Sequence, residues 1–225
     1  MIDVYSWSTG NARKIYICLE EMGLEYRVHP VNIGKGDQFK PEFLKISPNN
    51  RIPAIIDRDG PGMRDYSLFE TGAILIYLAE KTGKFRPADP GKWFDVIQWL
   101  MWQMGGIGPM FGQAGHFVRR KDEPGMAYAL KRYTDEAKRL CGVLDRRLAQ
   151  VEYVAGEDYS IADMAIYPWC QSPERRGLDL ADFPNVSRWF AVMAAKPATI
   201  RADEIAEEVR QRWAAEHGSA AGVAQ

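Results

Sequence analysis

The chain has 225 residues, of which 46% are hydrophobic, and its 29 Lys and Arg nearly balance its 30 Asp and Glu. This size allows one large domain or two small ones, and the formal net charge of −1 gives no reason to expect nucleic acid or an anionic membrane as a partner. No apolar stretch approaches the ~20 residues needed to cross a bilayer, and the N-terminus shows no signal-peptide pattern, so we expect a cytoplasmic protein.

The first part of the chain alternates between strand and helix patterns. Alternating apolar residues predict strands at residues 2–7 and 26–33, a third strand is expected at 53–57, and the turn signal at residues 59–62 predicts a return strand at 63–66. Helical periodicity or composition predicts helices at 12–22, 41–46 and 70–82. Gly23 and Gly83 follow the first and last of these helices, where a glycine commonly ends a helix. The predicted order is therefore βαβ, then α, then ββα.

Prolines and a glycine at residues 87–91 mark a boundary, after which we find no strand pattern. Helical periodicity or composition predicts an all-α region, with helices at residues 92–118, 124–150, 160–171, 184–195 and 200–216. Residues 217–225 lack apolar anchors. We predict one domain at 1–86, a second at 89–216, and a disordered tail at 217–225.

The cysteines and histidines give no sign of a metal site. The three cysteines are widely spaced and form no CxxC pair or zinc pattern, and the three histidines share no ligand spacing. Cys18 lies in an apolar run, where we expect it to act as a small buried hydrophobe. The cysteine content fits a reducing compartment, and no metal is expected.

Two motifs together suggest a peptide-binding site. Pro53 precedes a strand, and a cis bond before it would turn the backbone N–H and C=O of Ile52 outward to hold another peptide. Glu70 and Thr71 open a helix whose N-terminus can bind a small carboxylate. Together, the two motifs predict a binding site for a short anionic peptide. A capping box, with Ser67 as the cap and Glu70 folded back onto its own helix, remains the alternative for the second motif.

These motifs, in this order, resemble the glutathione site of the glutathione transferase family. In a second string, at residues 98–113, a predicted helix rich in aromatic residues is followed by Gly-Gly-x-Gly-Pro, and the helix should break or kink there. With residues 47–53 it resembles the nu class, the bacterial glutathione-dependent disulfide-bond oxidoreductases related to the yeast prion-forming nitrogen regulator. The resemblance, from residue 1 to about 200, implies a homodimer with an α/β plus all-α fold: an N-terminal thioredoxin-like domain (βαβαββα) and a helical C-terminal domain.

The resemblance also implies roles for particular residues. Glutathione would be the co-substrate, with Thr9 and Asn11 facing its sulfur, although Gly10 stands where the subgroup carries proline. Ser6, Ser8, Thr9 and Asn11 could equally cap the following helix, and the two roles are compatible. The other positions matching glutathione contacts are Gln38, Ile52, Glu70, Thr71 and, reaching the neighbouring subunit's site, Arg132. Structural roles fall to Pro53 and to the interior capping box of Ser160 and Asp163.

The implied activity is thiol–disulfide exchange between glutathione and a small disulfide substrate. No cysteine lies in residues 6–14, where a thioredoxin-like domain carries its reactive group, so a protein thiolate is excluded there. Two alternatives remain. One is a transferase that adds glutathione to a carbon electrophile, and the other is a non-catalytic regulator that binds glutathione or a protein partner.

Overall fold

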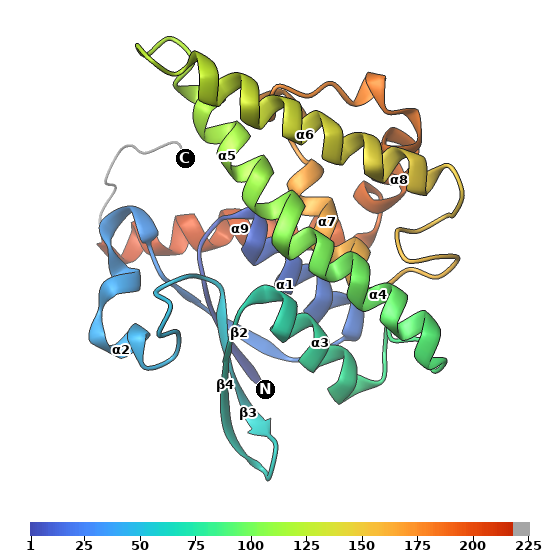
Figure 1. The fold of residues 1–225 in the computed structure, drawn as a ribbon. Coiled ribbons are helices and arrows are strands. Elements are labelled where there is room, and N and C mark those ends of the chain that lie inside the picture. The colour runs from blue at the N-terminus through green and yellow to red at the C-terminus, as the bar shows by residue number, and fades with distance from the viewer. Residues whose placement is uncertain (218–225) are drawn as a thin grey trace. The chain divides into compact units, whose positions relative to one another are not determined.

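The computed structural model describes residues 1–217 (Figure 1). Contacts between residues divide the chain into two compact units, which are described separately below. The first unit contains Met1–Lys84 and the chain from Lys196 onward, and the second contains Phe85–Ala195. Within the described residues, no helix is long and apolar enough to cross a membrane.

A four-stranded mixed sheet forms the centre of the first unit. Its strands are β1 (Ile2–Ser6), β2 (Tyr26–Pro30), β3 (Ala54–Gly60) and β4 (Arg64–Phe69), in the order β2-β1-β3-β4. β1 runs parallel to β2 and antiparallel to β3, and β3 and β4 form an antiparallel pair. This is the thioredoxin-like arrangement that the sequence predicted.

Helices cover both faces of this sheet because successive strand side chains point to opposite faces. On one face, α1 (Gly10–Met22) packs with α3 (Thr71–Thr82), and Ser6 of β1 bonds to Tyr16 of α1. On the other face, the short α2 (Pro41–Leu44) contributes Phe43 to a small apolar cluster with the strand residues Tyr5, Ala54 and Phe69.

The last helix, α9 (Pro197–His217), belongs to the first unit and packs along α1. Arg13 of α1 pairs with Asp203 of α9 at 2.5 Å, and Arg212 donates to the carbonyl of Val28 at 2.9 Å. The sequence placed this helix in the second domain, because its pattern shows only that it is helical. Of the predicted tail, His217 ends α9, and residues 218–225 lie outside the described part of the chain.

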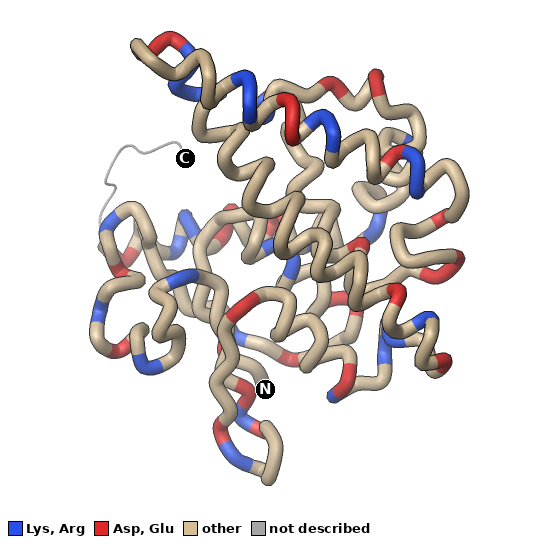
Figure 2. Tube along the Cα trace, in the orientation of Figure 1, with Lys and Arg blue, Asp and Glu red and all other residues tan. Residues whose placement is uncertain are grey.

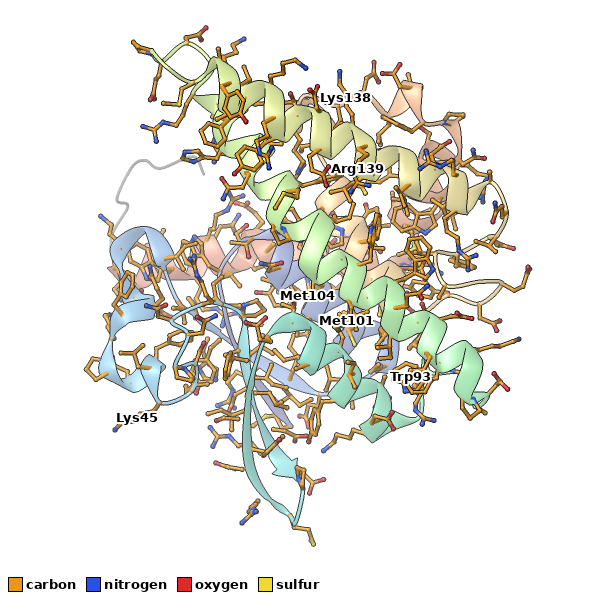
Figure 3. The ribbon with its side chains drawn as sticks, viewed as in Figure 1. Lys45, Trp93, Met101, Met104, Lys138 and Arg139 are labelled. Carbon is orange, nitrogen blue, oxygen red and sulfur yellow. The ribbon has the colours of Figure 1, made fainter. Side chains whose placement is uncertain are left out.

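The second unit is helical, as predicted. Its α-helices are α4 (Pro90–Trp102), α5 (Gly108–Arg119), α6 (Ala127–Leu148), α7 (Ile161–Cys170) and α8 (Pro184–Ala194). The glycine-rich string at residues 98–113 does not interrupt the helical structure between α4 and α5. It forms a single π-helical turn at Gln103–Ile107, which contains Met104 (Figure 3). The hydrogen bonds of a π-turn span five residues instead of the four of an α-helix, so the helix is locally wider. The proline that follows is tolerated because it lies in the first turn of α5.

A buried carboxylate organises the start of α7. Ser160 and Asp163 form the predicted capping box. Asp163 is 0% exposed, and its carboxylate also accepts hydrogen bonds from the Val154 N–H at 2.9 Å and from the indole Nε1 of Trp189 at 3.0 Å. One side chain therefore joins the preceding loop, the start of α7 and helix α8.

Candidate active site

The strand register brings three chain segments to one edge of the sheet in the first unit. Tyr5 of β1 pairs with Ala54 of β3, and Ala54 pairs with Phe69 of β4. Because both pairings are antiparallel, the chain leaving β1, the chain entering β3 and the chain leaving β4 lie at the same edge. The predicted Thr9–Asn11 turn, the Ile52-Pro53 peptide and Glu70–Thr71 occupy these three segments.

Thr9 is the N-cap of α1. It has extended backbone angles, and its Oγ1 accepts a hydrogen bond from the Ala12 N–H at 3.3 Å. A hydroxyl has one donor hydrogen and two lone pairs, so capping leaves Thr9 able to donate to a ligand. Gly10 and Asn11 are the first two helical residues. Thr9 and Asn11, the residues predicted to face the glutathione sulfur, therefore lie at the N-terminus of α1, which is the positive end of its dipole.

Ser6, another donor considered from sequence, has a structural role. It is fully buried, and its hydroxyl lies 2.6 Å from the hydroxyl of Tyr16. Burial raises the pKa of Tyr16 to about 12, so the phenol keeps its proton at neutral pH. This pair links β1 to α1 inside the core.

The turn before β3 is held by its own side chains. Ser47 is buried, and its hydroxyl donates to the carbonyl of Arg51 at 2.9 Å. The Ile52-Pro53 peptide is cis, as the sequence analysis expected. The half-buried Ile52 side chain packs against the apolar cluster of the first unit, which includes Phe43.

Glu70 has an unusual backbone conformation at the start of α3. Its φ is 71°, a region that residues other than glycine seldom adopt and that often marks functional positions. Glu70 is the N-cap residue but makes no capping hydrogen bond, and Ser67 lies within β4. The alternative capping box is therefore wrong. The Glu70 carboxylate is exposed, and it accepts a hydrogen bond from the Asn49 amide at 3.4 Å.

Lys14 was missed from the sequence. It lies on α1, is only 1% exposed, and donates from Nζ to Oγ1 of Thr71 at 3.3 Å. Burial lowers the pKa of Lys14 to about 7, and the negative charge of Glu70 offsets part of this effect. One signal was present in the sequence: Lys14 directly precedes Ile15–Leu19, a run of five residues without a charge that is typical of a buried helix face.

Gln38 lies in a 3₁₀ turn, Asp37–Phe39, in the segment that follows β2. The residue is half-buried, and its Oε1 is buried with no hydrogen-bond donor within the described part of the chain. A buried amide oxygen without a donor is costly, so this position suits a ligand N–H.

The three cysteines are buried and unpaired with one another. Burial raises the pKa of each thiol, that of Cys170 to about 12. Because the thiolate is the reactive form of cysteine, these side chains are poor nucleophiles. Among residues 1–217, no cluster of three or more His, Cys, Asp or Glu side chains is arranged to hold a metal ion.

Arg132 belongs to the second unit. It is an exposed residue of α6, along which acidic and basic side chains alternate (Figure 2). It lines a hollow of about 750 Å³ together with residues of α5 and α6 that include Met110, Tyr128, Lys131 and Arg139. Arg139 is labelled in Figure 3.

Comparisons with known proteins identify the family. The glutathione S-transferase N-terminal domain model matches residues 2–80, and the C-terminal domain model matches residues 107–197. The disulfide-bond oxidoreductase YfcG of Escherichia coli is 48% identical over 200 residues, covering 88% of this chain and 93% of that protein.

Two solved structures have similar folds. A glutathione transferase family member from Pseudomonas fluorescens, with two glutathione molecules bound, is 48% identical with a TM-score of 0.85, covering 90% of this chain and 92% of that one. A glutathione transferase from Pseudomonas putida, with one glutathione disulfide bound per subunit, is 44% identical with a TM-score of 0.85, covering 91% of each chain. The chain belongs to the glutathione S-transferase family and is an enzyme of that type.

Proposed function

We propose that the protein reduces small disulfides with glutathione as the only reacting thiol, and that it works as a homodimer. The observation that carries this proposal is the N-terminus of α1. It presents Thr9 and Asn11 but no cysteine, while the protein's own thiols are buried. The name of YfcG, a disulfide-bond oxidoreductase, supports the same activity.

Glutathione would bind along the sheet edge. Its γ-glutamyl end is a zwitterion, which suits the N-terminus of α3: the hydroxyl of Thr71 and the helix dipole favour the carboxylate, and the exposed Glu70 favours the ammonium. The backbone of Ile52 would hold the cysteinyl backbone, and the buried Oε1 of Gln38 would accept a ligand N–H. The glutathione molecules bound to the related Pseudomonas proteins support a site of this type.

The N-terminus of α1 would stabilise the glutathione thiolate. A cysteine thiol ordinarily has a pKa near 8.5, and each unit of lowering corresponds to about 1.4 kcal/mol of thiolate stabilisation. The hydroxyl of Thr9 can donate to the sulfur while its oxygen caps the helix. Asn11 follows two residues later, in the first turn of α1. Both groups stabilise an anion without supplying a nucleophile.

The reaction would then proceed in two exchanges. The bound thiolate attacks one sulfur of the substrate disulfide, forming a mixed disulfide and releasing a substrate thiolate, which takes up a proton. A second glutathione thiolate attacks the glutathione sulfur of the mixed disulfide, giving glutathione disulfide and the second substrate thiol. Two glutathione molecules are oxidised for each disulfide reduced. The pair of glutathione molecules bound to the Pseudomonas fluorescens relative fits this requirement.

One comparison of activities tests the proposal. Purified protein is assayed with glutathione and a small disulfide, and separately with glutathione and a chloronitroaromatic. We expect disulfide reduction to have the much larger kcat/KM. A larger value for the aromatic substrate would identify a conjugating transferase instead, and binding of glutathione with no turnover of either substrate would indicate a regulator.

Removing the protein's own thiols should leave the activity in place. We expect the triple variant Cys18→Ala, Cys141→Ala, Cys170→Ala to keep kcat/KM for the disulfide within about twofold, because the thiolate comes from glutathione. Alanine suits these buried, apolar positions. The assay is run after circular dichroism has shown that the variant is folded. Loss of activity in the folded variant would point to a protein thiol.

Arg132 should serve the site of the opposite subunit. We expect Arg132→Ala to weaken glutathione binding without unfolding the protein, because the residue is exposed and its guanidinium can bind a carboxylate in a bidentate manner. Mixed dimers pair an Arg132→Ala subunit with a Thr71→Ala subunit. They should contain one site of wild-type affinity and one that is doubly damaged, as measured by titration calorimetry. If no site of wild-type affinity forms, the cross-subunit role is wrong.

A further inference from the structure

We propose that Lys14 is a positioning residue for the γ-glutamyl end of glutathione, and that its buried ammonium orients the Thr71 hydroxyl toward the ligand carboxylate and couples binding to the uptake of a proton. This inference rests on the proposed glutathione site. It concerns a side chain that neither the sequence motifs nor the family resemblance singled out.

The direction of the Lys14–Thr71 hydrogen bond determines which way the Thr71 hydroxyl hydrogen points. The Lys14 Nζ and Thr71 Oγ1 atoms are 3.3 Å apart, and the two residues are 1% and 5% exposed. In its ammonium form, which a bound carboxylate favours, Lys14 has donor hydrogens and no acceptor, so the Thr71 oxygen accepts from it. The hydrogen of the Thr71 hydroxyl is therefore directed away from Lys14. A carboxylate at the N-terminus of α3 is a suitable acceptor for it.

The charges of Lys14 and Glu70 at the N-terminus of α3 match those of the γ-glutamyl end of glutathione. Lys14 lies behind Thr71 in the interior, and Glu70 lies at the same helix end but is exposed. The buried positive charge of Lys14 contacts Thr71, and the exposed negative charge of Glu70 is on the adjacent residue. Two opposite charges at one helix end complement the carboxylate and ammonium of an α-amino acid. The α3 dipole adds to the attraction for the carboxylate.

Charged side chains on the elements around Lys14 form ion pairs with other residues. On α1, Arg13 pairs with Asp203 of α9, and the remaining charged groups of α9 pair largely within that helix, as in Arg201–Glu204, Arg201–Glu208 and Arg210–Glu207. In the sheet, Asp3 pairs with His29 and Arg58, and Asp57 pairs with Lys81 of α3. Within the described residues, Glu70 is the charge that acts on the pKa of Lys14.

Proton linkage follows from this environment. Burial lowers the pKa of Lys14 to about 7, so a substantial part of the ligand-free protein carries a neutral amine at neutral pH. A bound carboxylate favours the ammonium and raises that pKa. Binding above pH 7 must then take up a proton, and the dissociation constant should rise roughly tenfold between pH 6 and pH 8.

Titration calorimetry with S-methylglutathione tests the inference, because this ligand has no thiol to ionise. The dissociation constant is measured at pH 6, 7 and 8 for the wild type, for Lys14→Met, and for Lys92→Met as a control at an exposed lysine of α4. Wild type and Lys92→Met should show the tenfold rise. Lys14→Met should bind about tenfold more weakly at pH 6, and its affinity should change less with pH. Titration of the ligand itself is common to all three proteins and cancels in the comparison.

The outcomes separate this inference from the proposed function. If Lys14→Met keeps the wild-type affinity or the wild-type pH dependence, the role of Lys14 is wrong. If Lys14→Met does not fold, wild-type titrations at pH 7.5 in buffers of different ionisation enthalpy decide: proton uptake on binding supports the inference, and no uptake overturns it. If the wild type binds no S-methylglutathione at any pH, the proposed glutathione site itself fails.

Discussion

Replacing Asp163 by alanine is expected to lower the free energy of unfolding by roughly 3–5 kcal/mol. The carboxylate is fully buried and accepts hydrogen bonds from the backbone N–H groups of Val154 and Ser160 and from the indole of Trp189. Alanine would leave these buried donors without an acceptor, at a cost of about 1–3 kcal/mol each before the surroundings relax. Urea denaturation followed by tryptophan fluorescence measures the change.

Asp158→Ala is a matched control for this change. Asp158 precedes the same helix but is exposed, so its replacement should alter the free energy of unfolding by no more than about 0.5 kcal/mol. Asp163→Asn should fall between the two, because it keeps one acceptor oxygen. A loss below about 1 kcal/mol for Asp163→Ala would show that the carboxylate does not hold the start of α7 in place.

Thr71→Ala is expected to raise the dissociation constant of glutathione by roughly 10- to 150-fold. A hydrogen bond between a hydroxyl and a charged carboxylate contributes about 1.5–3 kcal/mol, and alanine removes that donor. The change also removes the acceptor of the buried Lys14 ammonium, so the charge would no longer be linked to the ligand through the hydroxyl. Titration calorimetry at pH 6.5 measures the effect.

Thr71→Ser is the control for binding, because it keeps the hydroxyl and should bind glutathione within a few-fold of the wild type. Thermal unfolding of both variants distinguishes a loss of binding from a loss of folding. An unchanged dissociation constant for a folded Thr71→Ala protein would mean that the N-terminus of α3 does not bind the ligand carboxylate.

Local sequence signals accounted for the elements of the first unit. Alternating apolar residues located β1 and β2, and the turn signal at residues 59–62 located the hairpin of β3 and β4. Gly23 and Gly83 follow α1 and α3 with left-handed backbone angles of φ 66°. Short-range signals work here because strand and helix periods, and the glycine that ends a helix, depend on residues within a few positions of one another. The capping box of Ser160 and Asp163 was predictable for the same reason.

The start of α3 and the unit to which α9 belongs could not be predicted from neighbouring residues in the sequence. Ser67 and Glu70 have the spacing of a capping box, but Ser67 continues β4 because its strand pairs with β3, where Ile56 lies opposite Ser67. Pairing between strands therefore decided where α3 begins, and it left Glu70 with a φ of 71°. Similarly, α9 carries an ordinary helical pattern, and only its contacts with α1 assign it to the first unit.

The sequence by itself determined the kind of fold, the sheet-edge segments that carry Thr9, Ile52 and Thr71, and the absence of a cysteine beside them, because each is a property of neighbouring residues. The tertiary structure decided what surrounds these segments. Lys14 lies in the interior beside Thr71 because α1 and α3 pack on the same face of the sheet. The pKa of a lysine depends on that burial and on charges brought close by folding, neither of which is encoded by its position in the chain.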